Sequence, residues 1–301
     1  MNKAFIFPGQ GSQYVGMGKK ISKFPKISHN IFKLSKNILQ YDIKKLCLDG
    51  PSDILNRTVH TQPAIFINSI IKDRILKEKN IFPSAVSGHS LGEFSALVSA
   101  QIISFEDALK VIKIRAEEMY KSGKKKPGSM AAIIGANNKE IELICNQKEV
   151  VVIANYNSKK QIVISGEEKG IFNAINTAKK IGIKKAIPLK VSGAFHSPLM
   201  KDAKEKLKNI INKIDFSNSE VPIYQNITGK KEFDSNNIKT NLINQIDNPV
   251  KWVQTIINMD KDKYNYFIEV GPKNVLKKLN MQIIKNSTTK SFEELINYKN
   301  V

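Results

Sequence analysis

The chain has few cysteines and no long apolar run. Its two cysteines, Cys47 and Cys145, lie far apart in the sequence, so a disulfide framework is excluded. Neither they nor the four histidines have the close spacing of metal ligands, and we expect no metal site. No apolar segment approaches the roughly 20 residues that span a membrane. The apolar segment 4–7 is too short for the core of a signal peptide. We therefore expect a cytoplasmic protein with no membrane partner.

Arginine is also scarce, although the chain is strongly basic. The formal net charge is +21, yet only Arg57, Arg74 and Arg115 are arginines among 48 basic residues. The lysines are dispersed, and the only run of three, at 124–126, has no interleaved aromatic residues of the kind that line single-strand grooves. We expect no nucleic-acid partner. A basic surface instead favours an acidic protein partner through electrostatic steering.

A chain of 301 residues with 41% hydrophobic residues can form one large domain, or a large domain with a smaller insert. Its first part alternates strand and helix patterns, which is typical of an α/β fold. The expected elements are a strand at 3–7, helices at about 27–46 and 64–77, a strand at 85–87 and a helix from Ser104 to about Ser122.

The pattern changes after the lysine-rich linker at 124–128. The expected elements there are strands at 130–134, 150–154, 161–165 and 186–191, with helices at 139–146 and 170–181. This βαββαβ order is ferredoxin-like. A helix then follows Ser197, the last strand is expected at 264–270, and the polar tail after about Ser287 is expected to fray. We divide the chain into a large domain, 1–124 and 194–301, and a subdomain, 125–193.

The pentapeptide at 88–92, Gly-His-Ser-Leu-Gly, is the most informative motif. It follows a short apolar stretch and precedes helix-forming residues, which predicts a sharp strand-to-helix turn. In such a turn the flanking glycines let the backbone bend tightly, and the serine Oγ projects into solvent. Ser90 is therefore the candidate nucleophile for acyl transfer.

A serine nucleophile needs a base, and His196 is the candidate because it lies just past a strand, at the junction of the two units. The alternative is a histidine that packs or caps near Pro198. His89 is expected to be structural, because adjacent residues on a sharp turn point apart. His29 and His60 are interpreted as surface or core residues.

Arg115 falls on the apolar stripe of its predicted helix, so its guanidinium is expected to be buried. A buried arginine needs an anion. That anion is either a structural carboxylate of the protein or a carboxylate on the substrate, which the planar guanidinium binds through two hydrogen bonds.

The loop at 9–13, Gly-Gln-Gly-Ser-Gln, can supply a backbone amide to an oxyanion hole, with a second from Leu91. An ordinary glycine turn is the alternative. Dinucleotide and P-loop motifs fail on spacing. The segment 155–158, taken alone, is a plain turn.

Together these segments resemble the malonyl-CoA:acyl carrier protein transacylase family, in colinear order over nearly the whole chain. The matching segments are 7–13 (FPGQGSQ), 88–93 (GHSLGE), 155–158 (NYNS), 193–198 (GAFHSP) and 248–252 (NPVKW). The resemblance implies an α/β-hydrolase-like large domain that carries an inserted ferredoxin-like subdomain.

The resemblance also implies the roles of the site residues. They are Ser90 as nucleophile, His196 as base, Arg115 as partner of the malonyl carboxylate, the amides of Gln10 and Leu91 as oxyanion hole, and the Gln245 carbonyl as the group that orients the histidine. Phe195 and Leu91 resemble the malonyl-selective branch. Phe94 and Lys159 depart from the residues frequent in the family, tyrosine and proline.

The implied substrates are malonyl-CoA and phosphopantetheinylated acyl carrier protein, with no cofactor and no metal. We expect a monomer that supplies fatty acid synthesis. The alternatives are an acyltransferase of a polyketide pathway, a serine esterase or thioesterase, and an inactive module that docks carrier proteins. The intact set of Ser90, His196 and Arg115 argues against the last.

Overall fold

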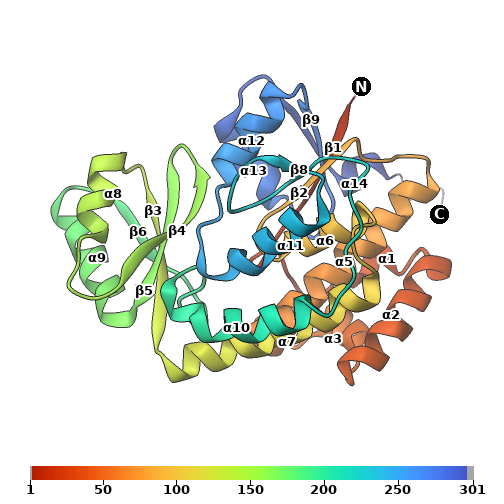
Figure 1. Ribbon diagram of the computed structural model, residues 1–301, viewed down its shortest axis with the longest axis horizontal. Coiled ribbons are helices and arrows are strands. Elements are labelled where there is room, and N and C mark those ends of the chain that lie inside the picture. The colour runs from red at the N-terminus through yellow and green to blue at the C-terminus, as the bar shows by residue number, and fades with distance from the viewer. Residues whose placement is uncertain (1, 297–301) are drawn as a thin grey trace.

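Two β-sheets organise the computed structural model, which describes residues 2–296 (Figure 1). The larger sheet has six strands in the order β10-β9-β1-β2-β7-β8, and all its pairings are parallel except that of β8. Its strands are β1 (Lys3–Phe7), β2 (Ala85–Gly88), β7 (Ile223–Tyr224), β8 (Lys231–Glu232), β9 (Tyr266–Glu269) and β10 (Thr288–Ser291).

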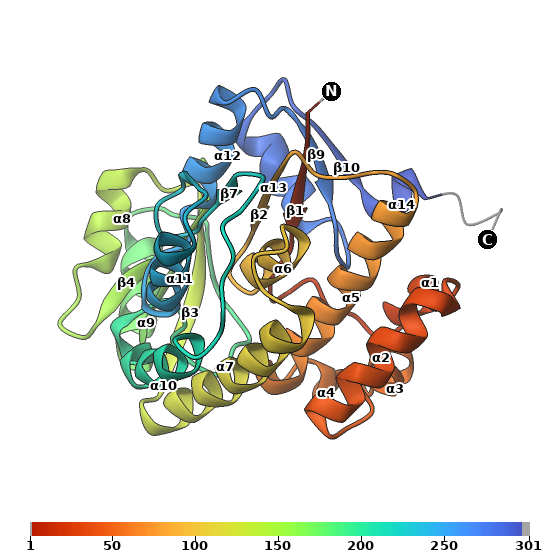
Figure 2. The same ribbon diagram turned by 45° about the vertical axis from the view of Figure 1, so that its right-hand side comes forward.

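Helices cover both faces of this sheet, as Figure 2 shows for β1 and β2. The helices of the large unit are α1 (Gly18–Ile21), α2 (Pro25–Leu39), α3 (Ile43–Asp49), α4 (Ser52–Leu55), α5 (Thr58–Glu78), α6 (Gly92–Ser99), α7 (Phe105–Lys125), α10 (Lys201–Ile211), α11 (Ser235–Asn244), α12 (Trp252–Lys261), α13 (Val275–Ile283), α14 (Phe292–Leu295) and the 3₁₀ turns η1 (Pro198–Met200) and η2 (Gln245–Asp247).

The apolar run of β1 is explained by burial on both sides. Successive side chains of a strand point to opposite faces. Accordingly, Phe5 and Phe7 join the core that contains α5 and α7, whereas Ala4 and Ile6 join the core of α12 and α13. A continuous hydrophobic strand is therefore central, and it ends at the loop that carries Gln10.

The smaller sheet is antiparallel, in the order β4-β5-β3-β6. Its unit consists of β3 (Gly128–Ile134), α8 (Asn138–Cys145), β4 (Val151–Ser158), β5 (Gln161–Glu167), α9 (Glu168–Lys180) and β6 (Lys185–Pro188). The predicted βαββαβ order is confirmed. On β3, Ala131 and Ile133 pack with α8 and α9, while Met130 and Ala132 face the core of the large unit. The second face of this sheet thus covers the large unit.

Several sequence expectations are corrected. The helix expected at 27–46 is two helices, because Gln40 adopts a left-handed conformation between α2 and α3. The segment 155–158 is the end of β4, where it pairs with β5, and not a turn. The polar tail does not fray at 288–295, because β10 pairs with β9 and α14 follows; residues 297–301 lie outside the described part.

Within residues 2–296, none of the helices combines the length and the apolarity that crossing a bilayer requires.

Candidate active site

Ser90 lies in a sharp bend between β2 and α6, as the pentapeptide predicts. Its backbone φ is 51°, a left-handed value that is uncommon for a residue with a side chain. A Cβ at Gly88 would overlap the backbone of Gly92, and a Cβ at Gly92 would overlap the Phe7 carbonyl of β1. The two glycines are therefore needed for the close approach of strand, bend and helix.

His196 meets Ser90 although 106 residues separate them in the chain. The Ser90 Oγ and the His196 Nε2 are 2.7 Å apart. The Nδ1 of the histidine lies 2.9 Å from the Gln245 carbonyl and 3.1 Å from the Asn248 carbonyl. Because carbonyls only accept, the proton is on Nδ1 and Nε2 is free to accept the serine proton. The predicted contact of the Gln245 carbonyl is present.

Burial, with a smaller contribution from the positive charge of Arg115, lowers the pKa of His196 to about 3, against the opposing effect of the two carbonyls. The histidine is 4% exposed. It is therefore a neutral imidazole at physiological pH, which is the state that a general base needs.

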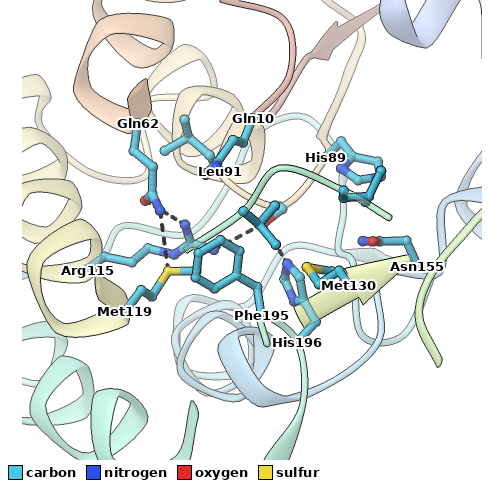
Figure 3. Close-up of a pocket in the computed structure, with 13 residues that line it drawn as sticks. Gln10, Gln62, His89, Leu91, Arg115, Met119, Met130, Asn155, Phe195 and His196 are labelled. Atoms are coloured by element: carbon cyan, nitrogen blue, oxygen red, sulfur yellow. Dashed lines mark hydrogen bonds between the residues drawn. The ribbon is translucent and has the colours of Figure 1, made fainter. Parts of the chain in front are cut away.

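Arg115, on α7, points its guanidinium at the same serine. Figure 3 shows this guanidinium at the pocket, joined to Gln62 by a dashed line. Its Nη1 donates to Gln62 Oε1 at 2.7 Å, and its Nη2 donates to Ser90 Oγ and to Gln245 Oε1, both at 3.1 Å. Arg115 is 1% exposed, and its Nε has no hydrogen-bond partner in the described structure.

No carboxylate of residues 2–296 forms an ion pair with Arg115. Burial lowers its pKa to about 10 and the negative charge of Glu93 opposes this, so the group stays charged at neutral pH. Of the two explanations that the sequence left open for this cation, a structural carboxylate in contact with it is absent from the described residues. A buried cation whose hydrogen-bond partners are all neutral still carries an uncompensated charge, and an anion from outside the protein can pair with it.

A cavity of about 110 Å³ lies above the serine, between the two units. Gln10 and Leu91 line its large-unit side, and Met130, Asn155 and Leu189 come from the small unit and its return segment. The loop of Gln10 reaches the bend closely, since a Cβ at Gly9 would overlap the His89 carbonyl. The backbone N–H groups of Gln10 and Leu91 have no acceptor among the described residues, so both can donate to a bound group.

A second cavity of about 200 Å³ adjoins the first and shares Gln10, His89 and Leu189 with it. Its other walls include the apolar side chains of Val163, Leu276 and Leu279. His89, expected to be structural, lines both cavities. Its Nε2 is 2.8 Å from Asn157 Oδ1 and its ring packs at 5.7 Å from that of Trp252.

Three polar residues of the site were not predicted. Gln62 holds the guanidinium of Arg115, and its amide is oriented by a 3.3 Å contact from Nε2 to the Met119 sulfur. Asn226 holds the backbone of the bend, and Glu93 accepts the backbone N–H of Asn226. Gln62 and Glu93 are polar side chains inside buried helical segments, and such positions are the one sequence signal that could have found them.

Three comparisons with known proteins agree over nearly the whole chain. The family described as "Acyl transferase domain" matches residues 4–299. A protein of Bacillus subtilis named malonyl CoA-acyl carrier protein transacylase is 38% identical over 288 residues, covering 93% of this chain and 91% of its own. The solved malonyl CoA-acyl carrier protein transacylase of Coxiella burnetii superposes with a TM-score of 0.94 at 36% identity, covering 97% and 94% of the two chains. A malonyl-transacylase solved in complex with a type II PKS acyl-carrier protein superposes with a TM-score of 0.93 at 34% identity, covering 97% of this chain and 96% of its own.

Proposed function

The chain belongs to the acyl transferase family, and we propose that it moves the malonyl group of malonyl-CoA to the phosphopantetheine thiol of an acyl carrier protein, for fatty acid synthesis. The observation that carries the proposal is the buried guanidinium of Arg115, which lies 3.1 Å from the Ser90 hydroxyl without a carboxylate partner among residues 2–296. A donor acyl group that bears its own carboxylate supplies the missing anion.

In the first half of the reaction, His196 Nε2 takes the proton of Ser90 as Oγ attacks the thioester carbonyl carbon. The resulting oxyanion accepts hydrogen bonds from the N–H groups of Gln10 and Leu91. Loss of one such donor typically costs about 3 kcal/mol of transition-state stabilisation. The carbon–sulfur bond then breaks, and the leaving thiolate takes the proton from His196. A malonyl ester of Ser90 remains.

The second half reverses these roles. His196 takes the proton of the carrier's thiol, whose sulfur attacks the ester carbonyl, and the same two amides bind the oxyanion. Ser90 leaves and recovers its proton from His196. Throughout, the fixed cation of Arg115 pairs with the malonyl carboxylate, which favours acyl groups that carry an acid.

The two adjoining cavities fit such substrates. The smaller, at about 110 Å³, is lined by Ser90 and Arg115 and suits a short acyl group. The larger, with its apolar walls and the polar side chains of Asn157 and Gln161, suits an extended pantetheine arm that brings its sulfur toward Ser90. Nucleophile, base, oxyanion donors and anion partner are all side chains or amides of the protein, so the two substrates complete the chemistry without a cofactor.

We also propose the division of the chain into 1–124 with 194–301 and an inserted 125–193, supported by the separate antiparallel sheet of β3 to β6. A cytoplasmic location belongs to the same proposal. It is supported by the free thiols of Cys47 and Cys145, which are usual in reducing compartments. The monomeric state stays a prediction.

Intact-protein mass spectrometry tests the function. After mixing with malonyl-CoA, the wild-type protein should carry a malonyl adduct that Ser90→Ala lacks, and phosphopantetheinylated acyl carrier protein should remove the adduct and acquire it. An adduct lost equally fast to water without the carrier would instead establish a thioesterase. Transfer to a polyketide carrier but not to a fatty-acid carrier would assign the polyketide alternative.

A further inference from the structure

Ser90 occupies a strained backbone conformation, and amide side chains hold both of its peptide groups. Its φ of 51° is sparsely populated by residues other than glycine, so the surrounding structure must fix it. The N–H of Ser90 donates to Asn226 Oδ1 at 2.6 Å, and its carbonyl accepts from Gln245 Nε2 at 3.0 Å. The bend is thus held from outside the local chain.

Asn226 bridges the bend. While its Oδ1 accepts the Ser90 N–H, its Nδ2 donates to the Gly88 carbonyl at 2.6 Å. One planar amide therefore fixes the last residue of β2 relative to the nucleophile. Asn226 is 1% exposed, so water does not compete for these bonds.

Glu93 anchors Asn226 in turn. It lies in the first turn of α6, is fully buried, and its Oε2 accepts the backbone N–H of Asn226 at 2.8 Å. Its Oε1 accepts Gln225 Nε2 at 3.2 Å, which fixes the preceding residue. The chain at 225–226 is thereby fastened to the same helix that starts at the bend.

The asparagine is also connected to the segment that orients the base. Its carbonyl accepts the N–H of Lys251 at 2.9 Å, and that residue is three positions after Asn248, whose carbonyl contacts His196 Nδ1. Asn226 forms no hydrogen bond with the Ser90 Oγ in the described structure; its bonds are to the backbone atoms on either side of that side chain.

We propose that Asn226, anchored by Glu93, is the positioning residue that holds the Ser90 Oγ in line with His196 and keeps the Ser90 N–H out of the oxyanion hole. The inference rests on the proposed function only in naming the acyl donor. Because the Ser90 N–H is taken by Asn226, the oxyanion is left to the amides of Gln10 and Leu91. A nucleophile displaced by about 1 Å can lose roughly 100-fold in rate.

Two substitutions test it. Asn226→Ala removes both bonds. Asn226→Asp keeps the shape and the acceptor for the Ser90 N–H but, when ionised, has no hydrogen to give the Gly88 carbonyl. When protonated, its carboxyl group supplies one acceptor and one donor, as the amide does. Burial favours that protonated form, and so does Glu93 while it is ionised. Burial raises the pKa of Glu93 itself to about 7, in the wild type as well, which is why each rate is compared with the wild-type rate at the same pH.

The rate of malonyl-serine formation should fall by roughly 10- to 100-fold in Asn226→Ala, with KM for malonyl-CoA changed less than about threefold. Asn226→Asp should be slow at pH 8 and recover toward the wild-type rate as the pH falls to 5.5, when each rate is divided by that of the wild type at the same pH. Asn68→Ala is the matched control, since Asn68 is also 1% exposed and donates to a backbone carbonyl, that of Met17, away from the bend.

Wild-type rates in Asn226→Ala, or a loss no larger than that of Asn68→Ala, would overturn the proposal. The proposal would also be overturned if the acylation rate of Asn226→Asp, divided by that of the wild type, did not change between pH 8 and pH 5.5. A fluorophosphonate, which labels an activated serine without needing a malonyl group, is applied to the same variants. If the wild type is labelled but takes no malonyl group, the proposed function fails, while the ratio of labelling rates still decides the role of Asn226.

Discussion

The Arg115 guanidinium donates a hydrogen bond to the Ser90 hydroxyl oxygen at 3.1 Å, so the cation touches the nucleophile itself. The same charge lowers the pKa of His196, the base that also contacts this hydroxyl at 2.7 Å. One buried charge thus acts on both reacting groups before any substrate binds. A carboxylate that enters the cavity neutralises this charge and draws the guanidinium toward itself.

The first prediction concerns acyl selectivity. Arg115→Ala should lower kcat/KM for malonyl transfer by at least about 100-fold, because a charge-assisted hydrogen bond contributes about 1.5–3 kcal/mol and two can form to one carboxylate. Acetyl transfer has no carboxylate to lose and should fall much less. Parallel assays with malonyl-CoA and acetyl-CoA measure this. Equal losses with both donors would remove Arg115 from carboxylate binding.

A second prediction follows from the neutral amide that now holds the arginine. Gln62→Glu should place a carboxylate 2.7 Å from Nη1, where Gln62 Oε1 now accepts. The new internal ion pair should compete with the malonyl carboxylate and raise KM for malonyl-CoA by about tenfold, or about 1.4 kcal/mol. Glu118→Gln, on the exposed side of α7 with its partner Lys121, is the control and should leave KM unchanged. An unaltered KM in Gln62→Glu would contradict the proposed pairing.

The pH dependence of Ser90 reactivity is the third prediction. His196 must be neutral to accept the serine proton. Its pKa of about 3 means that it stays neutral as the pH falls through 6.5, where an ordinary histidine gains its proton. Fluorophosphonate labelling of Ser90 should therefore hardly decline between pH 7 and pH 5. In Arg115→Ala the repulsion of the imidazolium is gone, so the acid limb should move to higher pH. A wild-type midpoint near 6.5 is the outcome that would refute this.

The parts of the site that local chemistry dictates could be predicted from the sequence. Two glycines around a serine define the bend, and a cation on an apolar helical stripe marks Arg115. Gln62 and Asn226 could not be found this way, because their roles depend on hydrogen bonds to residues that are distant in the chain. Gln62 bonds to Arg115, 53 positions away, and Asn226 bonds to Ser90, 136 positions away. The strand β10 was missed for another reason. As an edge strand with polar side chains, it lacks the hydrophobic pattern on which strand prediction rests.

The close approach of strand and helix gives a fourth prediction. A methyl group at Gly92 would overlap the Phe7 carbonyl, and neither backbone segment can move without distorting the central sheet. Gly92→Ala should lower the free energy of unfolding by about 3 kcal/mol and slow acylation of Ser90. Gly18→Ala is the control, since its Cβ would meet only side-chain carbons of Leu48 and Cys47 at 3.2 Å or more. Urea unfolding compares the two, and a Gly92→Ala protein as stable as Gly18→Ala would show that the bend tolerates a side chain.

The last prediction concerns a buried ion pair that fastens the C-terminal helix α14 to α5, elements that lie next to each other in Figure 2. Lys72 Nζ, on a side chain 2% exposed, donates to Glu293 Oε1 at 2.7 Å and to the Gly271 carbonyl at 2.6 Å. Glu293→Ala would leave this ammonium buried with a single neutral acceptor, so the free energy of unfolding should fall by about 3 kcal/mol.

Replacing both partners removes the stranded charge. The double variant Lys72→Met, Glu293→Ala should therefore regain most of the stability that Glu293→Ala loses, because methionine is close to lysine in size and leaves no unpaired charge in the interior. Lys290→Met is the matched surface control. Its pair with Glu294 is solvent-exposed and 4.0 Å long, so it should change the stability by less than about 1 kcal/mol. If the double variant is no more stable than Glu293→Ala, the attachment of α14 depends on the packing of the lysine and glutamate side chains and not on the balance of their charges.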